Sequence, residues 1–264
     1  IVVTQGYMSR IRGGHNTFAV RISSSPIAAP RPAIDLLVAL DQQTIDADRG
    51  DLVDDGIIIA DNSMNTRGSP ALLVPYSQLG SSRTANIVAL GVLGAILRLD
   101  ESLLADAVAD FFGTGKGHVD QSDVNRLALT AGYAWVKANT TAAFARFVLP
   151  PAGGTPDRMM MTSNDAIALG ALNAGVGFCA FYPMTPSTSI ALTLVENADN
   201  AGVIAEQAED EIAAINMAIG ASFAGARSIV VTSGGGFALM AEGVSLIGMT
   251  ETPVVIVVGQ RPGP

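Results

Sequence analysis

The stretch 176-VGFCAFYPMTPSTSIALTLV-195 decides the expected fold of the second half of this chain. Its apolar first part, residues 176–180, predicts a short buried strand, and its apolar-periodic last part, residues 190–195, predicts a helix. A strand that passes directly into a helix is typical of α/β proteins with parallel sheets, which bind ligands at the ends of their strands. The polar residues between the two elements are therefore candidates for a binding site. An ordinary strand-to-helix turn is the alternative.

Two prolines are expected to stiffen this connection. Pro183 and Pro186 each fix their own φ and restrict the residue before them, so the backbone through both is predicted to be extended. Thr185 would then be presented on a stiff loop. Ser187 or Thr188 is predicted to cap the helix that follows.

The composition is apolar for a chain of 264 residues. Hydrophobic residues make up 49%, charged residues 15%, and the mean hydropathy is +0.39. Buried parallel strands explain such a composition because they are continuous apolar runs, and a large subunit interface would add to it. The net charge of -9 argues against a nucleic-acid-binding protein, which needs a basic surface.

Cysteine and histidine are too scarce for a metal or redox site. The single cysteine, Cys179, excludes intrachain disulfides and a resident iron–sulfur cluster. It lies in an apolar strand, which favours a buried structural thiol over a nucleophile. His15 and His118 lie far apart without metal-ligand spacing. We therefore expect no metal site in this chain.

One uncharged run, residues 166–195, is long enough to span a bilayer. Breakers such as Asn173, Pro183 and Pro186 favour a core strand with flanking helices instead. The N-terminus has no signal-peptide pattern, so we expect a cytoplasmic protein that does not interact with membranes. The sequence starts without a methionine and ends as abruptly, and we expect it to be a piece of a longer chain.

The chain is predicted to contain two α/β domains, at 1–149 and 158–264, joined by a Pro- and Gly-rich linker at 150–157. The first is predicted to hold strands at 17–23, 34–40, 56–60 and 71–74 and helices at 84–97, 102–111 and 121–145. In the second, strands alternate with helices, which predicts a parallel sheet with right-handed crossovers. Its helices are predicted at 164–174, 187–197, 209–224 and 237–247 and its strands at 176–181, 202–206, 228–232 and 253–258.

The predicted helix at 209–224 begins with acidic residues. Glu209 and Asp210 suit the positive end of a helix and need no other role. Glu211 differs because the turns after it consist almost entirely of small residues. Such a helix packs closely against another surface, so this carboxylate is expected to be desolvated.

Two further strand ends carry polar groups. The run from Thr232 through Ser233 to Gly236 is read as a loop before a helix, in which glycines let the backbone approach a ligand or a phosphate. A flexible turn is the commoner meaning of such a run. Arg261 follows the last strand, where a guanidinium suits a carboxylate, although a salt bridge or an interface contact would explain it equally. With Thr185 and Glu211, these groups are expected at one edge of the sheet, around an anionic ligand that bears a carbonyl.

The run from Tyr182 to Thr188 resembles the Y-P-[IM]-T-P-S motif of 2-oxoacid:ferredoxin oxidoreductases. Segments similar to the same family follow in the same order, at 209–214, 220–227, 232–236 and 259–264. In that family the region is the α-subunit domain that holds the aminopyrimidine ring of thiamine diphosphate. The segment 5-QGYMSRIRGGHN-16 resembles the R-G-G segment of the family's γ domain, and a γ domain fused ahead of the α domain is typical of 2-oxoglutarate enzymes.

The resemblance implies a role for each candidate residue. Glu211 would bind N1′ of the aminopyrimidine, and its distance of nine residues from Gly220 favours it over Glu209. Thr185 and Arg261 would orient the carboxylate of the substrate. The remaining cofactor-binding residues would be Pro183, Thr232, Ser233 and Gly234. Coenzyme A contact or an interface role would fall to Arg10, Arg12, Gly13 and Gly14, for which a tight turn with solvated arginines is an equal alternative.

The resemblance also implies a partner. A β subunit would carry the Mg²⁺-bound diphosphate and a [4Fe–4S] cluster that passes electrons to ferredoxin, most simply in a dimer of heterodimers. The implied reaction is the coenzyme A-dependent oxidative decarboxylation of a 2-oxoacid, with 2-oxoglutarate preferred. Pyruvate or another 2-oxoacid, and a non-catalytic assembly subunit, are the alternatives.

Overall fold

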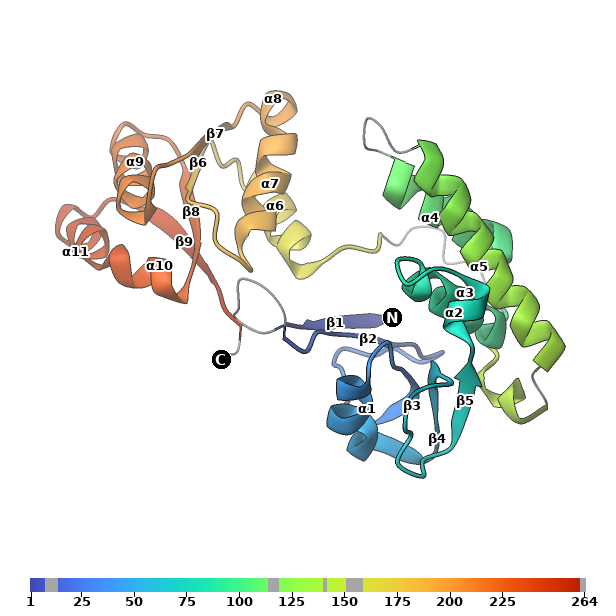
Figure 1. Ribbon diagram of the computed structural model, residues 1–264. Coiled ribbons are helices and arrows are strands. Elements are labelled where there is room, and N and C mark those ends of the chain that lie inside the picture. The colour runs from blue at the N-terminus through green and yellow to red at the C-terminus, as the bar shows by residue number, and fades with distance from the viewer. Residues whose placement is uncertain (8–13, 114–118, 140–141, 151–158, 262–264) are drawn as a thin grey trace. The chain divides into compact units, whose positions relative to one another are not determined.

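The computed structural model describes residues 1–7, 14–113, 119–139, 142–150 and 159–261. They form two compact units, and the first comprises the described residues up to 150 (Figure 1). The second comprises those from residue 159 onward. Both are α/β structures, as predicted, and the second has the predicted parallel sheet. The first also contains a parallel sheet, which was not predicted.

The second unit alternates helices and strands along its whole length. Its elements are α6 (Ser163–Asn173), β6 (Phe178–Phe181), α7 (Thr188–Glu196), α8 (Ala198–Ala201), β7 (Ile204–Gln207), α9 (Glu211–Phe223), β8 (Ser228–Ser233), α10 (Gly234–Leu239), α11 (Ala241–Thr250) and β9 (Val254–Gly259). The strands form one parallel sheet in the order β7-β6-β8-β9. All four strands therefore end at the same edge, where the candidate residues of the sequence follow them.

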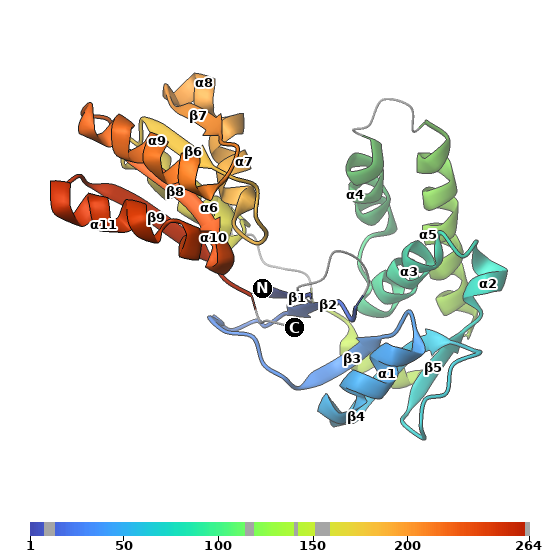
Figure 2. The same cartoon turned by 60° about the vertical axis from the view of Figure 1, so that its left-hand side comes forward.

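Helices cover both faces of this sheet because side chains alternate along each strand. Cys179 and Phe181 of β6 pack in a core with α6 and α7. Ala180, which lies between them, packs in a second core with α9. Figures 1 and 2 show the resulting layers, with α6 and α7 on one side of the strands and α9 and α11 on the other.

Cys179 is a structural residue, as the sequence indicates. Its side chain is fully buried in the core of the second unit. This burial raises the pKa of the thiol to about 12. The thiolate that a nucleophile requires is therefore unavailable at neutral pH.

The first unit contains an antiparallel ribbon and a parallel sheet, β3-β4-β5. Its elements are β1 (Val2–Gly6), β2 (Thr17–Arg21), β3 (Ile34–Val38), α1 (Gln42–Asp48), η1 (Arg49–Asp51), β4 (Leu52–Asp61), β5 (Ala71–Val74), α2 (Tyr76–Leu79), α3 (Ala85–Leu97), α4 (Glu101–Gly113), α5 (Val119–Asn139) and η2 (Ala142–Phe147). Ile58 and Ala60 of β4 face α1, whereas Ile59 joins the core formed with α3 and α5. The strand expected at 56–60 is thus longer than predicted.

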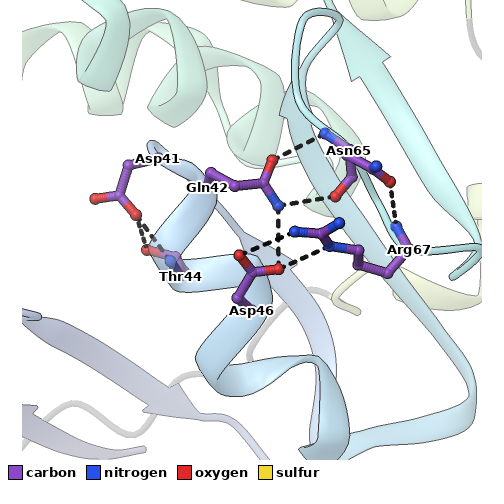
Figure 3. Close-up of polar contacts among 6 residues, drawn as sticks. All are labelled: Asp41, Gln42, Thr44, Asp46, Asn65 and Arg67. Carbon is purple, nitrogen blue, oxygen red and sulfur yellow. Dashed lines mark hydrogen bonds and ion pairs between the residues drawn. The ribbon is translucent and has the colours of Figure 1, made fainter.

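A polar network ties α1 to the connection between β4 and β5 (Figure 3). Arg67 forms two hydrogen bonds with Asp46, at 2.9 and 3.3 Å. The side chain of Gln42 donates to the carbonyl of Asn65 and accepts from its N–H, both at 2.9 Å. These groups are exposed, so the network fixes the shape of the connection more than it adds to stability.

Two predicted helices end or break earlier than the sequence indicates. The helix expected at 121–145 ends at Asn139, whose side-chain amide donates to the carbonyl of Trp135 at 2.8 Å. The helix expected at 237–247 is two helices, α10 and α11. They are separated at Met240, whose N–H is shared between two carbonyls of the preceding turn. The first strand, β1, has no counterpart among the predicted elements.

The uncharged run at 166–195 comprises α6 from residue 166 onward, the strand β6 and α7 up to residue 195. It is thus a core strand with flanking helices, as predicted. In the described part of the chain, no helix is both long and apolar enough to cross a membrane.

Candidate active site

The carboxylate of Glu211 lies at the first residue of α9. The preceding residue, Asp210, is the N-cap, and its side chain accepts a hydrogen bond from the N–H of Ala213 at 2.7 Å. Asp210 thus lies at the positive end of the helix, as expected, but as its N-cap and not within its first turn. Glu209 is exposed and precedes the helix, so its expected place in the first helical turn is wrong.

Glu211 is buried without a partner for one of its oxygens. Only 4% of the residue is exposed, and Oε1 is enclosed with no hydrogen-bond partner. The desolvation expected from sequence is thus present. A buried carboxylate oxygen without a donor costs free energy unless a ligand supplies one.

Thr232, near the end of β8, is the second buried polar group without a partner. The residue is fully buried, and its Oγ1 has no hydrogen-bond partner. Both groups surround the position of the Cβ that Gly236 lacks. An added Cβ would stand 2.1 Å from Oγ1 of Thr232 and 2.9 Å from Oε1 of Glu211. The end of β8, the start of α9 and the first turn of α10 therefore meet at this point.

The glycine run is helical, contrary to expectation. β8 continues to Ser233, and α10 begins at Gly234, so the glycines form a helical turn instead of a loop before the helix. A Cβ at Gly234 or Gly235 would meet nothing within 4 Å, and both residues are exposed. Only Gly236 is required for close packing.

The proline-containing connection forms a turn, not the extended backbone predicted. The N–H of Ser187 donates to the carbonyl of Met184 at 3.0 Å, and the peptide bond between Thr185 and Pro186 is cis. The Ser187 side chain does not cap α7. Its hydroxyl also donates to the carbonyl of Met184, at 2.9 Å, which directs it away from the helix. Ser187 occupies the N-cap position, as one of the two residues was expected to, but without a capping hydrogen bond from its side chain, and Thr188 is the first residue of the helix.

Asn164 of α6 anchors this turn, a role that the sequence did not reveal. Its side-chain amide nitrogen lies 2.9 Å from the carbonyl oxygen of Pro186 and 2.7 Å from Oγ of Ser189. The turn also packs against the end of β9, since a Cβ at Gly259 would stand 3.1 Å from Cβ of Ser187. The one sequence signal for this role of Asn164 is that it is a polar residue at the start of a capped helix.

Arg261 follows the end of β9 by two residues and is half-buried. Gly259 at the end of β9 is paired with Ser233 at the end of β8. The turn that contains Thr185 thus lies beside the end of β9, and Arg261 follows that end. Thr232 lies near the end of β8, next to Glu211. The structure places these candidates along neighbouring strand ends of one sheet edge, with Thr185 and Pro183 exposed there.

The candidates of the first half are only partly described. Arg10, Arg12 and Gly13 lie outside the described residues. Gly14 is exposed and has a φ of 98°, a conformation that favours glycine. His15 next to it pairs with Asp48 at 3.0 Å.

The donor set fits an aromatic heterocycle better than a metal. A buried carboxylate with an unpartnered oxygen can accept a hydrogen bond from a ring nitrogen that carries a proton, as N1′ of the aminopyrimidine of thiamine diphosphate does in its imino tautomer. Over the ranges that the structure describes, no three His, Cys, Asp or Glu residues are grouped as metal ligands.

Two family profiles match the chain. The profile for "Pyruvate ferredoxin/flavodoxin oxidoreductase" matches residues 1–135. The profile for "Pyruvate flavodoxin/ferredoxin oxidoreductase, thiamine diP-bdg" matches residues 169–264 and so covers the candidate site.

Relatives and a solved structure agree with these matches. The α subunit of a 2-oxoacid:ferredoxin oxidoreductase from a Sulfolobus species is 28% identical over 98% of this chain and 49% of its own length. The 2-oxoglutarate synthase subunit KorA of Archaeoglobus fulgidus is 48% identical over 40% of this chain and 30% of its own length. The structure of 2-oxoglutarate:ferredoxin oxidoreductase from Magnetococcus marinus, with 2-oxoglutarate, coenzyme A and succinyl-CoA bound, is 31% identical and has a TM-score of 0.83. The similarity covers 99% of this chain and 47% of that one, so the chain spans about half the length of such relatives.

Proposed function

This chain belongs to the pyruvate ferredoxin/flavodoxin oxidoreductase family, and from that premise we propose that it forms part of the α-type subunit of a 2-oxoacid:ferredoxin oxidoreductase. The proposed reaction is the oxidative decarboxylation of a 2-oxoacid with transfer of the acyl group to coenzyme A. The observation that carries the proposal is the buried carboxylate of Glu211, whose Oε1 lacks a partner at the edge where thiamine diphosphate is expected. The proposed site of action is the cytoplasm.

We favour 2-oxoglutarate as the substrate, which would yield succinyl-CoA. Relatives named 2-oxoglutarate synthase, and a solved structure with 2-oxoglutarate bound, support this choice. Two curated relatives that match 98% of this chain are named only as 2-oxoacid enzymes, so pyruvate and other 2-oxoacids are the second candidates.

Each unit has a proposed part in this function. Residues 158–264 form the domain that binds the aminopyrimidine of the cofactor, and residues 150–157 link it to a γ-type domain at 1–149. We propose that Arg10, Arg12, Gly13 and Gly14 of the γ-type domain contact coenzyme A or another subunit. Of these four residues the structure describes Gly14, whose φ of 98° is a conformation that favours glycine.

The side chains at the sheet edge have different proposed roles in the reaction. When bound, thiamine diphosphate supplies the nucleophilic carbon that attacks the 2-oxoacid. Glu211 would accept a hydrogen bond from N1′ of the pyrimidine when that nitrogen carries a proton, and so fix the orientation of the ring. Thr185 and Arg261 bind the carboxylate of the substrate and stabilise charge that develops beside it. The wall of the site is formed by Pro183, Ser233 and Gly234.

A β subunit completes the proposed enzyme. It would bind the diphosphate through Mg²⁺ and carry a [4Fe–4S] cluster, from which electrons pass to ferredoxin. We propose a dimer of such heterodimers. The designation of the relatives as α subunits supports a heteromeric assembly.

The variant Glu211→Gln tests the proposed function. The full-length protein, assembled with its partner subunit, is assayed for 2-oxoglutarate- and coenzyme A-dependent reduction of benzyl viologen. We expect the rate to fall by about 100-fold or more, because the amide cannot replace a buried carboxylate toward a ring nitrogen. Glu209→Gln is the matched control, since Glu209 is exposed two residues away, and should keep its rate. An unchanged rate for Glu211→Gln would refute the catalytic assignment.

A further inference from the structure

Two buried polar atoms without partners face the same small space. Oε1 of Glu211 and Oγ1 of Thr232 are the only unpartnered buried side-chain atoms of the second unit within the described residues. Each lies less than 3 Å from one point, the missing Cβ of Gly236. One is a hydrogen-bond acceptor and the other a donor.

Neither atom has a hydrogen-bond partner among the described residues of the protein. A buried hydroxyl or carboxylate oxygen without a partner loses its hydration and receives nothing in return. Such local cost is typical of groups that are arranged for a ligand and not for stability.

We propose that Thr232 is a positioning residue for Glu211. Its hydroxyl donates a hydrogen bond to the carboxylate when the pyrimidine of the cofactor occupies the site, and it holds that carboxylate in the orientation that accepts the ring nitrogen. This inference rests on the proposed function. In this proposal Thr232 acts through Glu211, because its Oγ1 and Oε1 of Glu211 face the same point, the missing Cβ of Gly236. A hydrogen bond to an ionised acceptor is strong enough to affect ligand affinity.

The packing around Gly236 explains why this residue has no side chain. Any Cβ there would occupy the space through which the hydroxyl reaches the carboxylate. A glycine is tolerated in this helix although it lowers helix stability, because α10 begins only two residues earlier. Thr232 of β8, Gly236 and Glu211 are therefore packed around the same space.

Two variants of Thr232 test the proposal, both in the full-length protein assembled with its partner subunit. Thr232→Val removes the hydroxyl and keeps the shape, and Thr232→Ser keeps the hydroxyl. Thiamine diphosphate affinity is measured by titration calorimetry, and Tm is measured without cofactor. We expect Thr232→Val to weaken binding at least fivefold and to leave Tm equal or higher, because an unpaired buried hydroxyl has been removed. Thr232→Ser should bind within twofold of the wild type.

Two further variants, the control Ser222→Ala and the reference Glu211→Gln, distinguish failure of this inference from failure of the proposed function. Ser222→Ala removes a buried hydroxyl that has a partner, the carbonyl of Pro253 at 2.6 Å, and should lower Tm without changing affinity. Binding of Thr232→Val within twofold of the wild type, or a lower Tm, would overturn the inference. If Glu211→Gln weakens binding and Thr232→Val does not, only this inference fails. If the wild type binds no thiamine diphosphate, the proposed function fails.

Discussion

Gly91 of α3 lies against the backbone of Leu129 in α5, so that an added Cβ would stand 2.2 Å from the carbonyl oxygen of Leu129. An added Cβ at Gly132 of α5 would likewise stand 2.5 Å from the carbonyl oxygen of Val88 in α3. Helices can approach so closely only where side chains are absent. The two glycines therefore set the separation of the main helix pair in the first unit.

Gly91→Ala is expected to destabilise the first unit by about 2 kcal/mol or more, because the clash is with backbone and exceeds the gain in helix propensity. Urea unfolding can be followed through the fluorescence of Trp135, the single tryptophan, which lies in α5. Gly50→Ala is the control, because a Cβ at Gly50 meets nothing within 4 Å. An unchanged urea midpoint for Gly91→Ala would contradict the close helix contact.

Gly236→Ala should affect both stability and cofactor binding in the second unit. The new methyl group would lie 2.1 Å from Oγ1 of Thr232 and 2.8 Å from Cγ of Glu211, so at least one of them must move. We expect a loss of about 1–3 kcal/mol and a fall of about tenfold or more in activity. Gly248→Ala in α11 meets nothing within 4 Å and should keep full activity. Normal activity of Gly236→Ala would show that the carboxylate tolerates displacement.

The sequence predicted the layered fold well where strands are short apolar runs. The strand expected at 228–232 is found at Ser228–Ser233, and the strand at 71–74 has the predicted bounds. Boundaries failed where tertiary contacts decide them. The apolar period continues through Met240, so the break between α10 and α11 has no sequence signal. Pairing with β2 makes residues 2–6 a strand, which a short apolar run alone does not indicate.

For the candidate site, the sequence predicted which strand ends carry polar groups but not how they meet. Parallel topology alone places Glu211 and Arg261 at the same edge. The contact of Gly236 with Glu211 and the bond from Asn164 to Pro186 depend on distances across the fold. No periodicity in a single sequence contains such distances.

The stability of the first unit is expected to depend on pH through the carboxylate of Asp61. Its carboxylate accepts hydrogen bonds from the hydroxyl of Ser63 at 2.6 Å, the N–H of Ser63 at 3.0 Å and the N–H of Tyr76 at 3.1 Å. These bonds, the Ser63 hydroxyl first, lower the pKa of Asp61 below its usual range. Because the folded pKa is depressed, the stabilisation is complete above the unfolded pKa of about 3.9 and is lost as the pH falls through the folded value.

Comparison of the wild type with Asp61→Asn isolates this effect. The difference between their urea midpoints, followed by Trp135 fluorescence, should be constant from about pH 7 to pH 5 and shrink below about pH 4. Other carboxylates with lowered pKa values, Asp41 and Asp46, are present in both proteins, so their effects cancel in the difference. A difference that grows on acidification would show that the assigned sign is wrong.

Asn164 is expected to control the turn that carries Thr185. In Asn164→Ala the carbonyl of Pro186 and the hydroxyl of Ser189 lose the amide that joins them to α6. We expect a stability loss of about 1 kcal/mol and faster hydrogen exchange at the amide of Ser187, which closes the turn.

If Thr185 binds the substrate carboxylate, the loosened turn should also raise KM for the 2-oxoacid several-fold, with a smaller change in kcat. Asn216→Ala is the matched control. The amide of Asn216 also donates to a backbone carbonyl, that of Ile212 at 2.8 Å, but within its own helix, α9, where Asn216 is exposed. It should show neither the KM change nor the faster exchange. Faster exchange without a change in KM would show that Asn164 anchors the turn but that Thr185 does not bind the substrate. Hydrogen exchange reports on the turn, whereas KM reports on substrate binding.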